Sequence, residues 1–468
     1  MDPLRLSRRV ARSLLSILFL APVAWSALLN AGPADSTAQS AKRNPATSSG
    51  AKPDTDATSG ADGKEQPDLA ALMSKAGDAL ERKDYQAALD PLKTVIRSAP
   101  DKPEAWYYLG YAYHGLRQDA EARQAYEKAV ELKPDLYQAQ LNLGLLLVAM
   151  NDAGAAVPHL EKAVSLKPSE ARLHFELGTA LRVSGQTAAA ATELRQALQL
   201  DPKLDSAAYD LGQAELDQKH YADAAADFTK ALGINPGRAD AELGLASAAE
   251  GLGQTAEAEQ HLEQFLKLQP ADVSVRYHLA RLYLREGKLE LALSHLQQLE
   301  QADPALPGLA AALGDAYALA GKFADSEVYY RKALATAPSG PDLADLHRAL
   351  AETLLKEGKT VGAEGEFRQA LRLDPGNADA EKGLASSVYL EKRYAEAAPM
   401  IEHLLQAPSA PAGLYFILAT CYDHLQDRKR ALEAYQQFLA RSNGSNPDQE
   451  WQAKQRAKLL GRELGKGL

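Results

Sequence analysis

Cysteine is almost absent from this chain, and so are the sequence motifs that carry chemistry. Cys421 is the only cysteine among 468 residues, so no disulfide can form within the chain, and we interpret it as a small apolar packing residue. There is no His-Glu-x-x-His zinc motif, no phosphate-binding loop and no Gly-x-Ser-x-Gly nucleophile turn. The ten histidines suggest no ligand cluster with cysteines or carboxylates. We therefore predict no catalytic residue, no metal and no cofactor, and that the protein is not an enzyme.

An excess of positive charge is also missing. The formal net charge is −10, and residues 69–468 carry 44 basic against 55 acidic side chains. Proteins that bind a nucleic-acid backbone release its counterions through a basic surface, and no basic stripe is visible here. We expect no nucleic-acid partner.

Proline, in contrast, recurs at a fixed interval. The spacing is 34 residues along most of the chain and 37 at the last step: Pro100, Pro134, Pro168, Pro202, Pro236, Pro270, Pro304, Pro338 and Pro375. A period of this length predicts an array of small units, each of which needs its neighbours to bury its apolar face. Such an array favours recognition along an extended surface over chemistry in a pocket.

Residues 103–136 show the pattern of one unit. Trp106, Leu109, Gly110 and Tyr113 share one face of a first helix, and Ala122, Tyr126, Ala129 and Val130 share one face of a second. Small residues at Gly110 and Ala122 allow the helices to approach closely, and Pro134 ends the second helix. The unit is predicted to be an antiparallel helical hairpin. Gly251 and Gly253 look like part of a phosphate loop, but this register places them in a turn between paired helices.

These residues resemble the signature of the tetratricopeptide repeat family: Trp106, Leu109, Gly110, Tyr113, Ala122, Tyr126, Ala129 and Pro134. The resemblance covers eleven frames, eight in residues 69–340 and three in residues 344–445, with residues 341–343 as an insertion. Residues 446–468 are predicted to form a capping helix, with Ala453, Ala457, Leu460 and Leu464 on its apolar stripe. The resemblance implies an all-α fold, a right-handed superhelical solenoid of antiparallel helix-turn-helix hairpins.

The first 68 residues differ from the rest in composition. Residues 1–34 have four arginines before an uncharged stretch from Ser13 to Ala34, which is typical of a signal peptide or a signal anchor. Both interpretations place the repeats outside the cytoplasm, in the periplasm if the source is bacterial, and residues 13–34 would tether an uncleaved chain to the membrane. Residues 35–68 lack aromatic side chains and are predicted to be a disordered linker.

The family resemblance implies that the first helices line a concave groove where a protein or peptide partner binds. The position after Trp106 bears large side chains in six successive frames that the hairpin core does not require: Tyr107, Leu141, Phe175, Tyr209, Leu243 and Tyr277. Nearby groove positions add further candidates: Tyr111, His114, Leu145, Arg182, Arg281 and Arg285. Aromatic and arginine side chains often anchor interfaces. The alternative is that these rings pack only against adjacent helices.

Two functions remain open at this point. The leading hypothesis is a non-catalytic scaffold that binds a protein partner in its groove and assists assembly of a cell-envelope or secretion complex. The second is an accessory subunit of an enzyme or carbohydrate-handling system, which binds a glycan or a catalytic partner. The oligomeric state is not indicated by the sequence.

Overall fold

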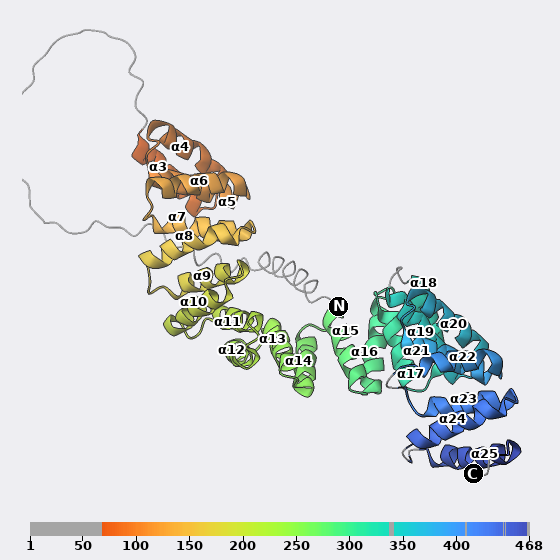
Figure 1. The fold of residues 1–468 in the computed structure, drawn as a ribbon. Coiled ribbons are helices and arrows are strands. Elements are labelled where there is room, and N and C mark those ends of the chain that lie inside the picture. The colour runs from red at the N-terminus through yellow and green to blue at the C-terminus, as the bar shows by residue number, and fades with distance from the viewer. Residues whose placement is uncertain (1–67, 337–340, 408–409, 443, 445, 466–468) are drawn as a thin grey trace, which may run out of the picture. The chain divides into compact units, whose positions relative to one another are not determined.

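The fold is built from helices alone within the described residues. The computed structural model describes residues 68–336, 341–407, 410–442, 444 and 446–465, and they contain 23 helices (Figure 1). Twenty-two of these helices form eleven successive hairpins, as the sequence predicts, and α25 follows them. The predicted signal segment and all but the last residue of the predicted linker lie outside this part of the chain. None of the described helices is long and apolar enough to cross a bilayer.

Each hairpin pairs an odd-numbered first helix with the even-numbered second helix that follows it. The first helices are α3 (Leu69–Glu81), α5 (Pro103–Gly115), α7 (Tyr137–Ala149), α9 (Ala171–Val183), α11 (Asp205–Asp217), α13 (Ala239–Gly251), α15 (Val273–Arg285), α17 (Leu309–Leu319), α19 (Pro341–Lys356), α21 (Ala378–Leu390) and α23 (Gly413–His424). The second helices are α4 (Tyr85–Ser98), α6 (Asp119–Leu132), α8 (Ala153–Leu166), α10 (Thr187–Leu200), α12 (Tyr221–Ile234), α14 (Thr255–Leu268), α16 (Leu289–Ala302), α18 (Phe323–Thr336), α20 (Thr360–Leu373), α22 (Tyr394–Leu404) and α24 (Arg428–Arg441).

Close approach of the two helices depends on the small residues that the sequence places between them. Ala122 is completely buried, and a Cβ atom at Gly110 would lie 2.7 Å from the ring of Tyr126. The same contact recurs in the fifth hairpin, where a Cβ at Gly212 would lie 2.8 Å from the ring of Phe228. Because these rings pack directly against the glycine backbone, no larger side chain fits there without a shift.

The turn inside each hairpin has a constant backbone geometry. If each repeat is counted from the residue equivalent to Pro103, position 15 has a positive φ angle in all eleven hairpins. Five hairpins use glycine there, including Gly253 at +74°, while the others use longer residues such as Lys219 at +62°. Gly253 therefore lies in the predicted turn, and Gly251 is the last residue of α13.

Position 4, where the second hairpin has Trp106, carries a hydrogen-bond donor in four hairpins. Four different donors reach the carbonyl of the repeat-ending proline six residues earlier: Trp106 to Pro100 at 2.8 Å, Gln140 to Pro134 at 2.9 Å, His174 to Pro168 at 2.9 Å and Arg276 to Pro270 at 2.6 Å. His174 also contacts Glu193 on the second helix at 2.7 Å.

The hairpins stack in chain order. Each helix packs mainly against its neighbours in sequence, and most helices two apart that contact one another are first helices, such as α7 with α9 and α9 with α11. Direct contacts join the first helices from α7 to α13 and from α15 to α21, so side chains at one repeat position follow each other along this first-helix layer. This layer is the surface on which the predicted groove residues lie.

The C-terminal hairpins depart from the regular repeat. The three extra residues at 341–343 lie in the first turn of α19, which has 16 residues where most first helices have 13. Pro399 lies inside α22, which has 11 residues where the other second helices have 14. Helix α25 (Pro447–Glu463) packs on α24 and buries Ala453, Ala457 and Leu460. It thus covers the last hairpin, as expected of a capping helix.

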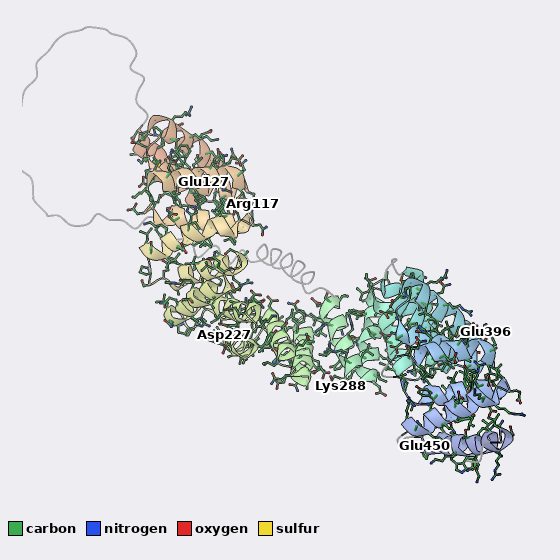
Figure 2. All side chains as sticks on the ribbon, in the orientation of Figure 1. Arg117, Glu127, Asp227, Lys288, Glu396 and Glu450 are labelled. Atoms are coloured by element: carbon green, nitrogen blue, oxygen red, sulfur yellow. The ribbon has the colours of Figure 1, made fainter. Side chains whose placement is uncertain are left out.

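Ion pairs join successive hairpins at a recurrent pair of positions. Position 21 of one hairpin meets position 16 of the next, as in Glu364 with Arg393 at 2.9 Å and Glu259 with Lys288 (Figure 2). The second and third hairpins use the same positions with the charges exchanged, because Arg123 lies 3.5 Å from Asp152. Where both positions are charged, the charges are opposite, and either hairpin can carry the acidic residue.

Candidate protein-binding face

The side chains predicted to line the groove lie on the first-helix layer, but they are covered to very different extents. Tyr107 is half-buried; its ring centroid lies 6.0 Å from that of Tyr126, and its hydroxyl oxygen lies 3.5 Å from the amide of Asn142 on the next first helix. Burial raises the pKa of Tyr107 to about 12. Tyr107 is therefore part of the contact between two hairpins as well as of the surface.

Two members of the predicted ladder belong to the core. Leu141 is 4% exposed and Tyr209 is 7% exposed. The ring of Tyr209 packs on Phe228 at 5.7 Å, and the Arg238 guanidinium covers it at 4.3 Å. The expectation that the hairpin core does not require this position is wrong for Leu141 and Tyr209; Tyr209 is closed over by Phe228 of its own hairpin and by Arg238, the residue before α13.

Other predicted residues retain accessible surface. Phe175 on α9 and Tyr277 on α15 are half-buried, and the Tyr277 hydroxyl donates to the carbonyl of Gly308 at 3.1 Å. Tyr111 packs edge-on against Tyr85 at 6.1 Å. His114 is half-buried 3.6 Å from Asp119, and burial lowers its pKa. Phe175 and Tyr277 remain the most accessible rings of the predicted ladder.

The predicted arginines do not form one site. Arg182 on α9 lies 3.9 Å from Asp210 on α11, whose carboxylate also accepts from Thr179 at 2.7 Å. Arg281 and Arg285 are exposed on α15, in the seventh hairpin. Two hairpins separate it from the fourth hairpin, which carries Arg182. Arg182 is thus engaged in holding two first helices together, whereas Arg281 and Arg285 lie at the surface.

Several carboxylates of the layer have raised pKa values. Glu176 pairs with Arg172 at 3.3 Å, and burial raises the pKa of Glu176 despite this partner. Partial burial likewise raises the pKa of Asp217 at the end of α11 and of Asp315 on α17, although both residues keep exposed surface.

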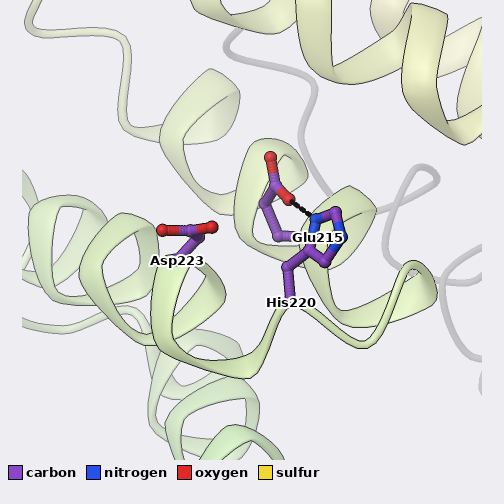
Figure 3. Close-up of side chains that lie close together, drawn as sticks. All are labelled: Glu215, His220 and Asp223. Carbon is purple, nitrogen blue, oxygen red and sulfur yellow. Dashed lines mark hydrogen bonds and ion pairs between the residues drawn. The ribbon is translucent and has the colours of Figure 1, made fainter.

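One group of side chains bears on the expectation that the histidines form no ligand cluster with carboxylates. Glu215, His220 and Asp223 place their ligand atoms within 4.8 Å of one another, and His220 lies 2.8 Å from Glu215 (Figure 3). Glu215 is 1% exposed and also pairs with Arg195. A guanidinium already neutralises this buried carboxylate, so the group is explained as an ion-pair network between α10, α11 and α12.

A pocket at the C-terminal end of the layer was not predicted. It has a volume of about 470 Å³ and is lined by Tyr389, Phe416, His424 and, from α25, Trp451. Trp451 is 64% exposed. The signal in the sequence was that Trp451 lies outside the apolar stripe by which α25 packs.

Family models match most of the array. The model described as "Protein kinase G tetratricopeptide repeat" matches residues 119–328, and two described as "Tetratricopeptide repeat" match residues 74–137 and 346–454. These matches agree with the helical hairpins in order and position. The chain belongs to the tetratricopeptide repeat family.

Individual relatives of this tetratricopeptide repeat protein match only in part. Superkiller complex protein 3 of Homo sapiens is 40% identical over 63 residues, which are 14% of this chain and 4% of that protein. The structure titled "MamA 41-end from Desulfovibrio magneticus RS-1" is 25% identical, with a TM-score of 0.35, over 37% of this chain and 98% of that one. The structure titled "YrrB: a TPR protein with an unusual peptide-binding site" is 20% identical, with a TM-score of 0.37, over 40% and 97%. The chain thus matches only a small part of the length of Superkiller complex protein 3.

Membership of the family supports a protein-interaction scaffold, since tetratricopeptide repeat proteins are generally scaffolds without catalytic activity. On the layer of first helices, Phe175 and Tyr277 are half-buried, and an aromatic pocket lies at the C-terminal end.

Proposed function

We propose that the protein is a non-catalytic scaffold that binds an extended or helical segment of a partner protein along its first-helix layer. The observation that carries this proposal is direct contact between first helices, from α7 to α13 and from α15 to α21. Side chains that stay accessible on these helices include two rings and two arginines: Phe175, Tyr277, Arg281 and Arg285. Several such anchors spread over the first helices suit a long segment better than a small molecule.

We further propose that the array works outside the cytoplasm, in the assembly of a cell-envelope or secretion complex. This part rests on the basic and then uncharged pattern of residues 1–34. Fractionation of the source cells, with protease added before and after the cytoplasmic membrane is opened, measures it. Degradation of the array only after the cytoplasm has been opened would contradict an exported location.

The binding surface can be mapped by photo-crosslinking in the source organism with the full-length chain. A photoreactive amino acid replaces Phe175 or Arg285 on the first-helix layer in separate variants. Matched controls carry it at Val328 on α18 and Val361 on α20, which are 63% and 72% exposed on second helices. We expect the same partner to be captured from both first-helix positions and not from the controls.

The controls make the outcome decisive, because all four positions are accessible to solvent or half-accessible and tolerate replacement. Capture of a partner only from Val328 and Val361 would place binding on the second helices and reject the proposal. Mass spectrometry of the crosslinked product identifies the partner and the bound segment at the same time.

A further inference from the structure

The pocket at the C-terminal end lies where the first-helix layer meets α25. Phe416 and His424 on α23 and Tyr389 on α21 form one wall, and Trp451, Gln452 and Gln455 of α25 form the other. Here α25 packs on α24 and leaves about 470 Å³ open.

The aromatic wall is held in place from behind. The Phe416 ring packs on Tyr435 at 6.0 Å and on Phe438 at 5.3 Å. His424 stacks on Tyr394 with the ring centroids 4.3 Å apart and the planes 4° from parallel. Trp451 faces them from a helix whose own buried contacts are Ala453, Ala457 and Leu460. Its large apolar ring therefore serves no purpose in packing α25.

The pocket carries no net charge. Its carboxylate, Asp423, accepts two hydrogen bonds from Arg456, at 2.5 and 2.6 Å. Burying a further charge beside this closed pair would bring a desolvation cost without a partner. An uncharged occupant is therefore favoured at this end, in contrast to the carboxylate-rich middle of the layer.

Polar groups on α25 offer hydrogen-bond donors. The side chains of Trp451, Gln452 and Gln455 make no hydrogen bond within the described part of the chain, and each carries at least one N–H. A polyproline II segment exposes its backbone carbonyls, and its prolines have no N–H of their own. The exposed carbonyls of such a segment can accept hydrogen bonds from these donors, and its proline rings pack well on aromatic side chains.

We propose that this pocket binds an uncharged, proline-rich segment of a partner protein in the polyproline II conformation. The proposal rests on the proposed function to the extent that the occupant belongs to a protein partner. Trp451 provides the platform for a proline ring, and Gln452 and Gln455 donate to the carbonyls of the segment.

Calorimetry on the full-length protein tests the proposal with three defined probes. The first is a blocked ten-residue peptide of alternating alanine and proline, the second is a blocked ten-residue peptide of glycine and serine, and the third is maltotetraose. We expect the proline peptide to bind with a dissociation constant of about 10–100 µM, an affinity usual for a few good contacts. The other two probes should bind at least tenfold more weakly.

Variants locate the binding. Trp451→Ala should weaken binding of the proline peptide at least tenfold, and Gln455→Ala should weaken it about threefold. Val361→Ala, which removes an exposed side chain on α20 outside the pocket, should leave the affinity unchanged. Both pocket residues are exposed, so the far-ultraviolet circular dichroism of every variant should match that of the parent chain.

Each of three results would overturn the proposal: no binding of the proline peptide, equal binding of the glycine–serine peptide, or an unchanged affinity after Trp451→Ala. Preferred binding of maltotetraose would overturn it as well and assign the pocket to a carbohydrate. The crosslinking at Phe175 and Arg285 does not depend on this pocket. If the proline peptide does not bind but crosslinking at Phe175 and Arg285 captures a partner, only the pocket assignment is rejected.

Discussion

The N-terminal half of the array, from α5 to α12, and the C-terminal half, from α18 to α25, use the same repeat in different ways. Tyr209 and Phe416 occupy the same repeat position, and each packs on a ring of its own second helix, at 5.7 Å and 6.0 Å. Tyr209 is then covered by Arg238 of the next hairpin, whereas Phe416 faces the pocket beside α25.

The element that follows a hairpin determines whether the side chain at position 5 is buried in the core or stays accessible at the surface. In both halves, an aromatic ring on the second helix of the same hairpin packs against the side chain at position 5. A following hairpin removes it from solvent, and the end of the array leaves it accessible. Four sets of substitutions test this difference, and the first should have the largest effect.

The largest effect is expected from truncating the two rings. Tyr209→Ala should lower the free energy of unfolding by about 3 kcal/mol, because a 7% exposed ring leaves a cavity between two hairpins. Phe416→Ala should cost about 1–2 kcal/mol, since its ring already faces a pocket. Urea titrations of both variants measure the difference. Equal losses would show that the following hairpin does not determine the role of position 5.

The second effect concerns ion pairs between hairpins. Glu364 has a side chain that is 7% exposed beside Arg393 and Arg368, so Glu364→Lys should cost about 2 kcal/mol by burying like charges. The matched change Arg123→Glu faces Asp152 at an exposed pair and should have no measurable effect.

Exchanging both partners separates charge from shape. Glu364→Arg combined with Arg393→Glu restores the opposite-charge order found naturally at Arg123 and Asp152. We expect it to recover part of the stability lost in Glu364→Lys, measured by the same titration. A double variant as unstable as the single one would show that side-chain shape, and not charge, holds this boundary.

The third effect is a pH dependence in the N-terminal half. Burial, with Glu215 nearby, raises the pKa of Asp227 on α12 to about 6 (Figure 2). A raised pKa means that the folded state binds the proton more tightly, so stability falls as the pH rises from about 4 through 6.

Asp227→Asn removes this loss. It should stabilise the protein by about 1 kcal/mol at pH 8, a value reduced for the partial exposure of the side chain, and have little effect at pH 4. Thermal unfolding at the two pH values provides the measurement. Stabilisation of the same size at both would assign the effect to packing instead of charge.

The smallest effect is expected in the hairpin turns. Lys219 has a φ angle of +62°, and Gly358 occupies the same turn position in the C-terminal half at +78°. Lys219→Gly should relieve backbone strain and raise stability by at most about 0.5 kcal/mol, because glycine also costs more entropy on folding. Gly358→Ala should lower stability by about 1 kcal/mol. Parallel urea titrations measure both variants. Stabilisation by Lys219→Gly and destabilisation by Gly358→Ala would confirm that this turn position keeps its positive φ angle whichever residue occupies it.

Much of the fold could be predicted because it depends on local periodicity. The interval between prolines and the small residues at Gly110 and Ala122 predicted eleven hairpins and their register, and the structure confirms both. The turns were harder, because residues such as Lys219 adopt an angle that only glycine signals in a sequence. The donor role of position 4 was also hidden, since Trp106, Gln140 and His174 look unrelated until they reach the same carbonyl.

The candidate site was predicted less completely. The sequence identified the ladder position, yet it could not show that Leu141 and Tyr209 would be covered while Phe175 stayed accessible. It did not indicate that His220 would approach Glu215 or that Trp451 would face Phe416. These contacts join helices through their packing angles, which no short-range pattern records.

By itself, the sequence determined the unit, its number and its order, because each hairpin forms from apolar and small residues spaced within 34 positions. Only the tertiary structure decided which of those side chains a partner can reach. Accessibility depends on what the next element covers: a hairpin buries Tyr209, and α25 leaves a pocket beside Phe416.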